Sequence, residues 1–92
     1  MARLILTRAL SAQTQGDLEH EVAGESVGEA LASLFERYPQ LRRYLLTDTG
    51  SVRQHVNVFL NEALIEDRRA LSDAVGPGDR IHVIQAVSGG WR

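Results

Sequence analysis

The chain has 92 residues, a formal net charge of −2 and a hydrophobic share of 43%, which together allow one small folded domain. Its ten basic residues are all arginines, so it contains neither lysine nor cysteine. This composition excludes a disulfide scaffold, a thiolate zinc site, a thiol nucleophile and a Schiff-base amine. The net acidic charge favours neither nucleic acid nor an anionic membrane as a partner. The apolar run 4–6 is too short for a signal peptide or a membrane span, so we expect a cytoplasmic location.

Two strands joined by a turn are predicted for the first 23 residues. Residues 4–10 are rich in Leu and Ile, and the polar stretch 13–17 with its glycine ends that run. Residues 17–23 then alternate, with Leu18, His20 and Val22 on one face. A β-hairpin is the simplest structure that fits this pattern.

A helix is predicted from residue 27. The segment 26–29 matches a capping box, in which the Ser26 hydroxyl accepts a helix N–H and Glu29 reaches back to the Ser26 N–H. Apolar residues follow at helical spacing, at Val27, Ala30, Leu31, Leu34 and Phe35. Pro39 disfavours helical geometry at Tyr38 and ends the helix. The spacing recurs over one further turn, at Leu41, Tyr44 and Leu45.

The next predicted elements are a turn and a strand with a short return partner. Residues 47–51 are turn-like, and residues 55–61 alternate strictly, with Val56, Val58 and Leu60 on one face. A turn at 61–62 leads to a short partner strand at 64–65.

The rest of the chain is predicted to hold a charged loop, a turn and a last strand. Residues 66–69 are interpreted as a solvated charge cluster. The segment 76–79 suits a type II turn, and residues 80–87 form the last strand, with Ile81 and Val83 facing inward.

These elements predict an α+β fold, with a mixed sheet of about four to five strands and one main helix packed on it. The connection from the second strand through the helix is expected to return to a parallel neighbour with right-handed geometry. We expect one domain over residues 1–88 and a flexible tail over residues 89–92.

No catalytic or metal site is predicted. The histidines, His20, His55 and His82, share no ligand spacing and are interpreted as sheet-surface residues rather than ligands or bases. The acidic pairs at 19/21 and 66/67 are interpreted as solvated faces. The serines form no Gly-x-Ser-x-Gly elbow and the glycines no phosphate loop, so an enzyme is not expected.

Four motifs together resemble a known family. They are the segments 26–31 (SVGEAL), 55–61 (HVNVFLN), 78–84 (GDRIHVI) and 86–90 (AVSGG). This set is similar to the ubiquitin-like β-grasp sulfur carriers of the MoaD/ThiS family, and it resembles the actinobacterial cysteine-synthesis type. The resemblance covers nearly the whole domain and implies the β-grasp fold.

The resemblance implies chemistry at a C-terminal carboxylate. In such carriers a ubiquitin-activating-type enzyme, an adenylyltransferase/sulfurtransferase, uses ATP to adenylate the terminal glycine, which is then converted to a thiocarboxylate. The matching glycine is Gly90, preceded by Gly89, and a tail without Cβ atoms can thread a narrow active site. The sulfur then passes to a biosynthetic enzyme, and the carrier itself binds no cofactor. Molybdopterin, thiazole, cysteine, methionine and a secondary metabolite all stay open as the product.

The chain departs from the family where Trp91 and Arg92 follow Gly90. An internal amide cannot be adenylated as a carboxylate, so we expect the chain to be clipped after Gly90. The resemblance implies a zinc-dependent JAMM-type metalloprotease for this step. The alternatives are an inert extension on a degenerate paralogue and residues introduced in cloning.

A docking surface is predicted from the alternation of two strands. If Val58 and Val83 face inward, Phe59 and Ile84 face outward, with Arg80 and His82 around them. Ordinary surface residues are the alternative interpretation of this spot.

Two other classes of protein stay open. One is a ubiquitin-like modifier whose Gly90 is joined to lysines of other proteins. The other is a β-grasp interaction domain that is not conjugated.

Overall fold

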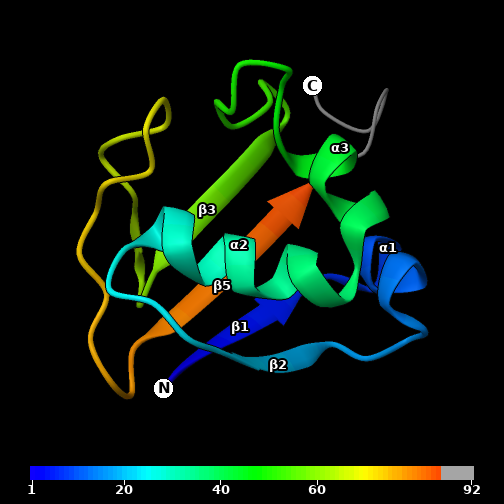
Figure 1. Cartoon of the computed structure of the whole chain (residues 1–92), viewed down its shortest axis with the longest axis horizontal. Helices are drawn as coiled ribbons and strands as arrows, with labels where there is room; N and C mark the ends of the chain where they lie inside the picture. Colours follow the sequence, from blue (N-terminus) through cyan, green and yellow to red (C-terminus); the bar gives the residue numbers. More distant parts are fainter. Residues whose placement is uncertain (86–92) are drawn as a thin grey trace.

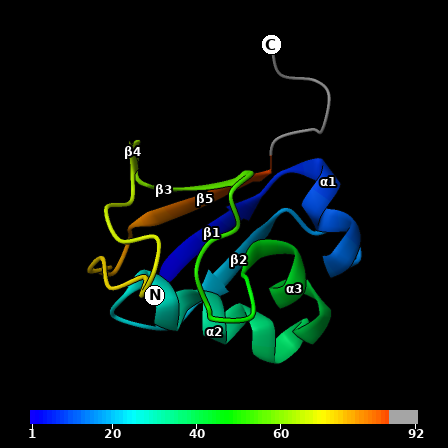
Figure 2. The ribbon, with the colours of Figure 1, turned by 90° about the horizontal axis from the view of Figure 1, so that it is seen from above.

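A five-stranded mixed sheet forms the centre of the computed structural model, which describes residues 1–85 (Figure 1). Its strands are β1 (Ala2–Leu6), β2 (Glu19–Val22), β3 (Val56–Leu60), β4 (Ala63–Leu64) and β5 (Arg80–Gln85). They lie in the order β2-β1-β5-β3-β4. Figure 2 shows the helices α2 (Val27–Arg37) and α3 (Arg42–Leu45) on one side of this sheet. The predicted α+β class is therefore confirmed.

The first and last strands form the parallel pair of the sheet. β1 pairs with β2 in antiparallel register, as the predicted hairpin requires, and with β5 in parallel register, while β5 pairs with β3 in antiparallel register. The expected parallel return after the helix is wrong, because the chain leaves α2 for β3, and β1 and β5 separate β3 from β2. Because β1 and β5 run parallel, both strands end at the same end of the molecule.

The predicted first strand is too long. β1 ends at Leu6, and residues 8–14 instead form α1 (Arg8–Ser11) and the short 3₁₀ turn η1 (Ala12–Thr14). Leu10 and the next residue, Ser11, are both buried. A strand with one buried face would not bury both, because its successive side chains point to opposite faces. In β2, His20 and Val22 are buried as expected, but Leu18 precedes the strand and is 40% exposed.

Helix α2 begins and ends as predicted, but its cap differs in one contact. The Ser26 Oγ accepts the Glu29 N–H at 3.1 Å, whereas the Glu29 carboxylate accepts the Glu25 N–H at 2.8 Å rather than the Ser26 N–H. Gly24, at φ +141°, brings the incoming chain tightly against the first turn and so places the Glu25 N–H over it. Both contacts still satisfy donors at the helix N-terminus.

The predicted extra turn after Pro39 is divided between η2 (Pro39–Leu41) and α3. Leu41 and Leu45 are buried as expected, but Tyr44 is 39% exposed. At 3.6 residues per turn Leu45 lies nearly in line with Leu41, whereas Tyr44 lies further round the helix, at the edge of the buried face.

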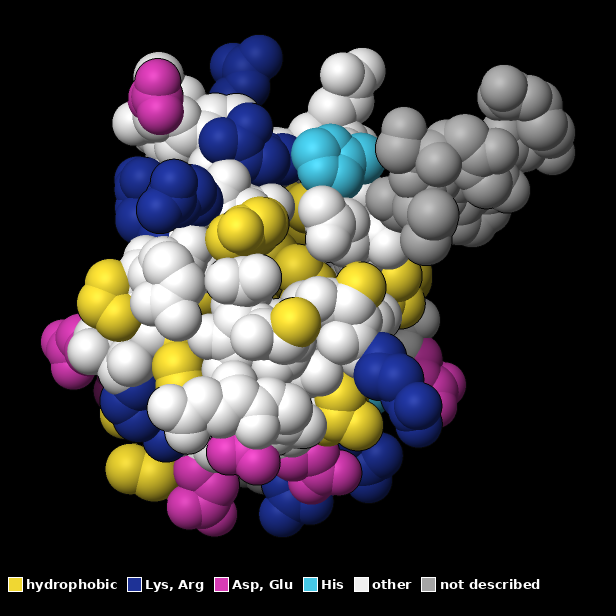
Figure 3. Space-filling model, turned by 90° about the vertical axis from the view of Figure 1, so that its right-hand side faces the viewer, with side chains coloured by type: hydrophobic (Ala, Val, Ile, Leu, Met, Phe, Trp, Pro, Cys, Tyr) yellow, Lys and Arg dark blue, Asp and Glu magenta, His cyan; other side chains and the backbone are white. Residues whose placement is uncertain are grey.

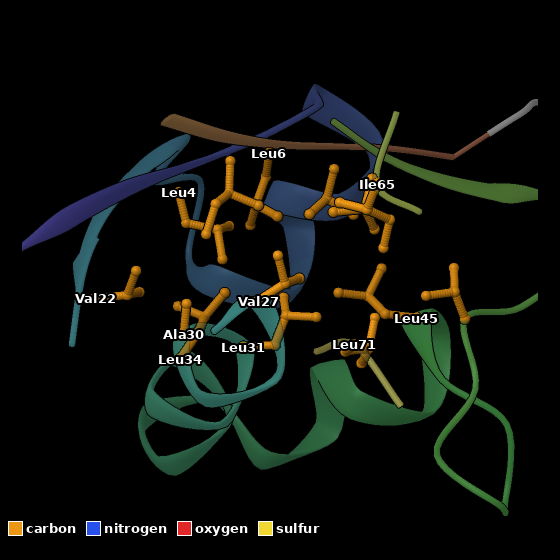
Figure 4. Close-up of a cluster of buried hydrophobic side chains, with 14 of the residues drawn as sticks. Leu4, Leu6, Val22, Val27, Ala30, Leu31, Leu34, Leu45, Ile65 and Leu71 are labelled. Atoms are coloured by element: carbon orange, nitrogen blue, oxygen red, sulfur yellow. The ribbon is translucent and has the colours of Figure 1, made fainter. Parts of the chain in front are cut away.

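The core lies between the inner face of the sheet and the helices. Figure 4 shows Leu4 and Leu6 of β1 pointing toward Val27 and Leu31 of α2. The inward residues predicted for the strands at 55–61 and 80–87 are buried at Val56, Val58, Ile81 and Val83. Leu60 and Phe35 are only partly buried.

The predicted turns at 47–51 and 76–79 are confirmed. The Thr47 N–H donates to the Ser51 carbonyl at 2.8 Å, and the Asp79 N–H donates to the Gly76 carbonyl at 3.1 Å. Gly78 has φ +85°, as the third residue of a type II turn requires.

Residues 66–69 are more than the solvated charge cluster that was expected. Asp67 accepts hydrogen bonds from the Ser72 hydroxyl and from the N–H groups of Ala70, Ser72 and Arg69, and the Ser72 hydroxyl comes first among the causes that lower the Asp67 pKa to about 2. Arg68 is half-buried and donates to two main-chain carbonyls. Both side chains therefore hold loops in place. None of the helices in the described residues is long and apolar enough to cross a membrane.

Candidate functional site

The face of the sheet turned away from α2 and α3 is the candidate docking surface, called the outer face below. The pairing registers place on it Arg3, Ile5, Glu19, Glu21, Asn57, Phe59, Leu64, Arg80, His82 and Ile84. Each of these side chains is exposed or half-buried, while their neighbours along the strands are mostly buried. The outer face is thus the side of the sheet that a partner can reach.

Apolar side chains cross the middle of the outer face. Ile5 lies opposite His82, His82 opposite Phe59, and Phe59 opposite Leu64. Ile84 lies one step along β5, opposite Asn57, and so sits diagonally from Phe59. We call Ile5, Phe59, Leu64 and Ile84 the outer apolar patch. Leu64 is 55% exposed and Ile84 39% exposed, which leaves apolar area open to a partner.

The four predicted docking residues all lie on the outer face, but not all together. Phe59, Ile84 and His82 are neighbours, and Phe59 and His82 are half-buried because their cross-strand partners flank them. Arg80 lies at the start of β5, about 13 Å from Ile84 at the usual rise of a strand. It pairs in register with Arg3 instead. Their role in docking stays a prediction.

Ile5 and Leu64 belong to the patch but were not predicted as site residues. Ile5 sits inside the apolar run 4–6, where the alternation of a strand would have turned it away from its two buried neighbours. Leu64 joins the patch only through its register with Phe59, which follows from the turn between β3 and β4. The alternation around Ile5 could therefore have predicted that it faces outward, whereas no local pattern could have placed Leu64 beside Phe59.

The start of β5 is held by a polar network. The Arg80 N–H donates to the Asn61 Oδ1 at 3.1 Å, and the Asn61 Nδ2 donates to the Asp79 Oδ1 at 3.4 Å. Beside it, Arg3 forms an ion pair with Glu19 at 3.5 Å between two exposed side chains, an arrangement that contributes little to stability. This end of the outer face is therefore charged rather than apolar.

The predicted reactive residues, Gly89 and Gly90, and the predicted processing residues, Trp91 and Arg92, lie outside the described residues. The last described residue, Gln85, pairs with Val56 at the start of β3. It follows Ile84 directly, so the outer apolar patch extends to the end of the described part of β5.

The three histidines lie in different places. His82 is on the outer face, His55 is exposed in the turn before β3, and His20 is buried, so its interpretation as a surface residue is wrong. The His20 Nε2 lies 3.0 Å from the Asp17 carbonyl, and its ring meets Tyr38 edge-on at 5.6 Å. Residues 1–85 contain no group of three His, Cys, Asp or Glu side chains that could hold a metal ion.

The strand order and the helix packed on one face define a ubiquitin-like β-grasp protein. The chain also matches the family model described as the ThiS family over residues 6–90, and it belongs to that family. The resemblance to the ubiquitin-like β-grasp sulfur carriers is thus confirmed.

Solved structures and named relatives agree with this assignment. The crystal structure of the Amycolatopsis orientalis BexX/CysO complex holds a similar chain, with a TM-score of 0.84, 25% identity, and coverage of 98% of this chain and 100% of that one. The sulfur carrier protein CysO of Mycobacterium tuberculosis is 24% identical over 83 residues, which cover 88% of this chain and 89% of that protein. Small archaeal modifier protein 1 of Haloferax volcanii is 34% identical over 71 residues, which cover 76% and 77%.

Proposed function

We propose that this chain is a sulfur carrier that holds sulfur as a thiocarboxylate at Gly90. One observation carries the proposal: the family match runs to residue 90 and so ends at the second glycine of the Gly89-Gly90 pair. The relative named a sulfur carrier protein supports the same class. A carrier that holds sulfur on its terminus needs no thiol of its own, which fits a chain without cysteine.

The proposed chemistry begins with hydrolysis of the peptide bond between Gly90 and Trp91. This step consumes one water and releases a Trp-Arg dipeptide, leaving a carboxylate on Gly90. That carboxylate attacks the α-phosphate of ATP and releases pyrophosphate, which forms an acyl-adenylate. Hydrosulfide then attacks the carbonyl carbon, the new C–S bond replaces the C–O bond to AMP, and AMP leaves. The product is a thiocarboxylate.

Three partners follow from this chemistry. A JAMM-type metalloprotease trims the tail, a ubiquitin-activating-type enzyme binds the ATP and performs the adenylation, and a biosynthetic enzyme accepts the sulfur. The carrier binds no cofactor. We assign docking of the activating enzyme to the outer apolar patch, with His82 at its centre and Arg80 at the charged end of the outer face. The reason is that the patch includes Ile84, the residue before the last described one, and Gly90 follows six residues later in the chain.

A second candidate function is a ubiquitin-like modifier. The observation that favours it is the 34% identity to a small archaeal modifier protein. In that case Gly90 would form an amide with a lysine of another protein. Because this chain has no lysine, it could not carry further copies of itself on its own side chains.

Two assays test the proposal. Incubation of the full chain with extract of its own cells should remove Trp91 and Arg92, as read by intact mass. A chain that ends at Gly90 should support ATP–pyrophosphate exchange by the activating enzyme, and the full chain should not. Exchange at equal rates with both chains would contradict an adenylated Gly90, and mass adducts on lysines of other proteins would favour the modifier.

A further inference from the structure

Five arginines gather at the end of the molecule where β3 begins. They lie in two segments, 42–53 and 68–69, and are Arg42, Arg43, Arg53, Arg68 and Arg69, called the arginine cluster below. Figure 3 shows basic side chains gathered at the upper end of the molecule, the end that carries α3 in Figure 1.

Hydrogen bonds to the main chain fix two of these side chains. The Arg53 Nε donates to the Arg43 carbonyl at 2.6 Å. One terminal nitrogen of Arg68 donates to the carbonyls of Arg53 and Val56, at 2.6 and 2.8 Å. Because a guanidinium has five N–H donors, both side chains keep further donors in fixed orientations.

No carboxylate of residues 1–85 forms an ion pair with the cluster. Within that range the one ion pair shorter than 4.0 Å joins Arg3 and Glu19, far from these segments in the fold. The carboxylate of Asp67 is close in the chain, but its oxygens accept N–H groups of its own loop and the Ser72 hydroxyl. Five arginines thus stand against three acidic residues in or next to the same segments, and none of the five is held in an ion pair within residues 1–85.

An open hollow of about 540 Å³ lies at one side of the cluster, next to two of its five arginines. Arg68 and Arg69 line it together with Thr47, Ser51, Val52 and Gln54. These residues offer guanidinium, hydroxyl and amide donors and include no acidic side chain. A carboxylate is a good match, because arginine can bind it through two parallel hydrogen bonds.

The cluster stands beside the described end of β5. Arg68 holds the Val56 carbonyl, and Val56 pairs with Gln85, the last described residue of β5. A protein that receives the residues after Gln85 must approach this end of the molecule.

Individual carboxylates fit the cluster better than a polyphosphate chain does. Asp48, Glu66 and Asp67 stand among the five arginines, and the whole chain has a net charge of −2. A continuous phosphate backbone would meet these acidic residues, whereas separate Asp and Glu side chains can pair with separate arginines.

We propose that the arginine cluster docks an acidic surface of the protein that acts on the C-terminal residues. This proposal rests on the proposed function. It adds a second, charged contact to the contact made by the outer apolar patch, and both contacts lie near the described end of β5. Interfacial charges of this kind mainly set partner choice and association rate, so binding through the cluster should weaken with salt.

The test uses the double variant Arg42→Gln/Arg69→Gln. Both side chains are exposed and make no hydrogen bond within the described residues, so the fold should be unchanged. The control, Ala23→Glu/Ala32→Glu, changes the net charge equally at two exposed positions, one just before α2 and one on it. Thermal unfolding of all three proteins checks that they are folded.

For ATP–pyrophosphate exchange, the wild type, the double variant and the control are all prepared as chains that end at Gly90. The activating enzyme should show a KM for the double variant roughly fivefold higher than for the wild type, with kcat unchanged. The KM for the control should equal that for the wild type. Added salt should reduce the difference in KM between the wild type and the double variant. Equal KM values for variant and wild type, or an equal rise in the control, would overturn the proposal.

A second readout does not depend on the proposed function. A short polyglutamate peptide is titrated into the full chain while the Nε–H resonances of the arginines are followed by NMR. The peptide should shift the resonances of Arg53 and Arg68 in the wild type and less in the variant. Shifts spread evenly over all arginines, or tighter binding of a short oligodeoxythymidine, would overturn the proposal even if no adenylation is seen.

Discussion

At the scale of one residue, Gly24 lets the segment between β2 and α2 pass very close to the first turns of α2. It has φ +141°, and a Cβ there would lie 2.7 Å from the Glu29 Cβ and 2.8 Å from the Ala30 main-chain nitrogen. The main-chain atoms of a helix cannot move aside as a flexible side chain can. The position therefore requires glycine for two reasons, its backbone conformation and the close approach.

Replacing Gly24 by alanine should lower the free energy of unfolding by about 2–3 kcal/mol, through strain and a steric clash with α2. Gly16→Ala is the matched control, because Gly16 also has positive φ, +89°, but a Cβ there would have no other atom within 4 Å. The control should cost about 1 kcal/mol, from the backbone conformation alone. Urea unfolding measures both, and equal losses would show that the close approach is unimportant.

Asp67 predicts a pH dependence. Its pKa is lowered from 3.8 to about 2, first by the Ser72 hydroxyl and then by main-chain N–H groups. A carboxyl whose pKa is lower in the folded state stabilises the fold above its unfolded pKa, and this stabilisation is lost as the pH falls from about 4 toward 2. The variant Asp67→Asn should be less stable than the wild type at neutral pH.

The difference between Asp67→Asn and the wild type should shrink as the pH falls through this window. Urea unfolding at several pH values measures it. A difference that stays constant between pH 4 and pH 2 would contradict the assigned pKa.

At the scale of elements, local sequence patterns predicted an element correctly where all of its apolar residues fall on one buried face. The capping box and the helical spacing at 26–35 gave α2, since Val27, Leu31 and Leu34 must all be buried at once. The run 4–10 has no clear period, so the change from strand to helix after Leu6 could not be predicted. Tyr44 was predicted to face inward with Leu41 and Leu45, but it lies at the edge of the face that they share and is 39% exposed.

The same division holds for the candidate site. Alternation along β3 and β5 was enough to turn Phe59 and Ile84 outward. The contribution of Leu64 depends on the register of β4, and that of Arg68 on loops brought together by the fold, so neither could be derived from local pattern. Gly89 and Gly90 were identified from family motifs rather than from geometry.

The outer apolar patch predicts a specific binding defect. Ile84→Ala should weaken binding to the activating enzyme by about 1 kcal/mol, because Ile84 is 39% exposed and loses contact area with the partner rather than core packing. Phe59→Ala should act in the same direction. Surface plasmon resonance with the activating enzyme measures the affinity.

Leu18→Ala is the matched control for the patch. Leu18 is 40% exposed but lies before β2, outside the outer apolar patch. It should leave the affinity unchanged. Equal losses for Ile84→Ala and Leu18→Ala would show that the patch has no special role in docking.

At the scale of the whole molecule, the parallel pairing of the first and last strands sets the geometry of the carrier. β5 lies between β1 and β3, so the strand that leads to the tail has neighbours on both sides. This central position keeps Val83 and Ile81 in the core while Ile84 faces outward, one residue before the last described one. The sheet thus presents the candidate docking surface on the strand that leads to the C-terminal residues, and this arrangement suits the proposed carrier, which is handed from one enzyme to another.

The most direct test of the central claim is the intact mass of the chain ending at Gly90 after reaction with ATP, the activating enzyme and sulfide. We predict a gain equal to the mass difference between sulfur and oxygen, located on the C-terminal peptide. The full chain, with Trp91 and Arg92 in place, should show no gain. An unchanged mass for the chain ending at Gly90, under conditions where the enzyme converts its own known carrier, would contradict the assignment of Gly90 as the sulfur-carrying residue.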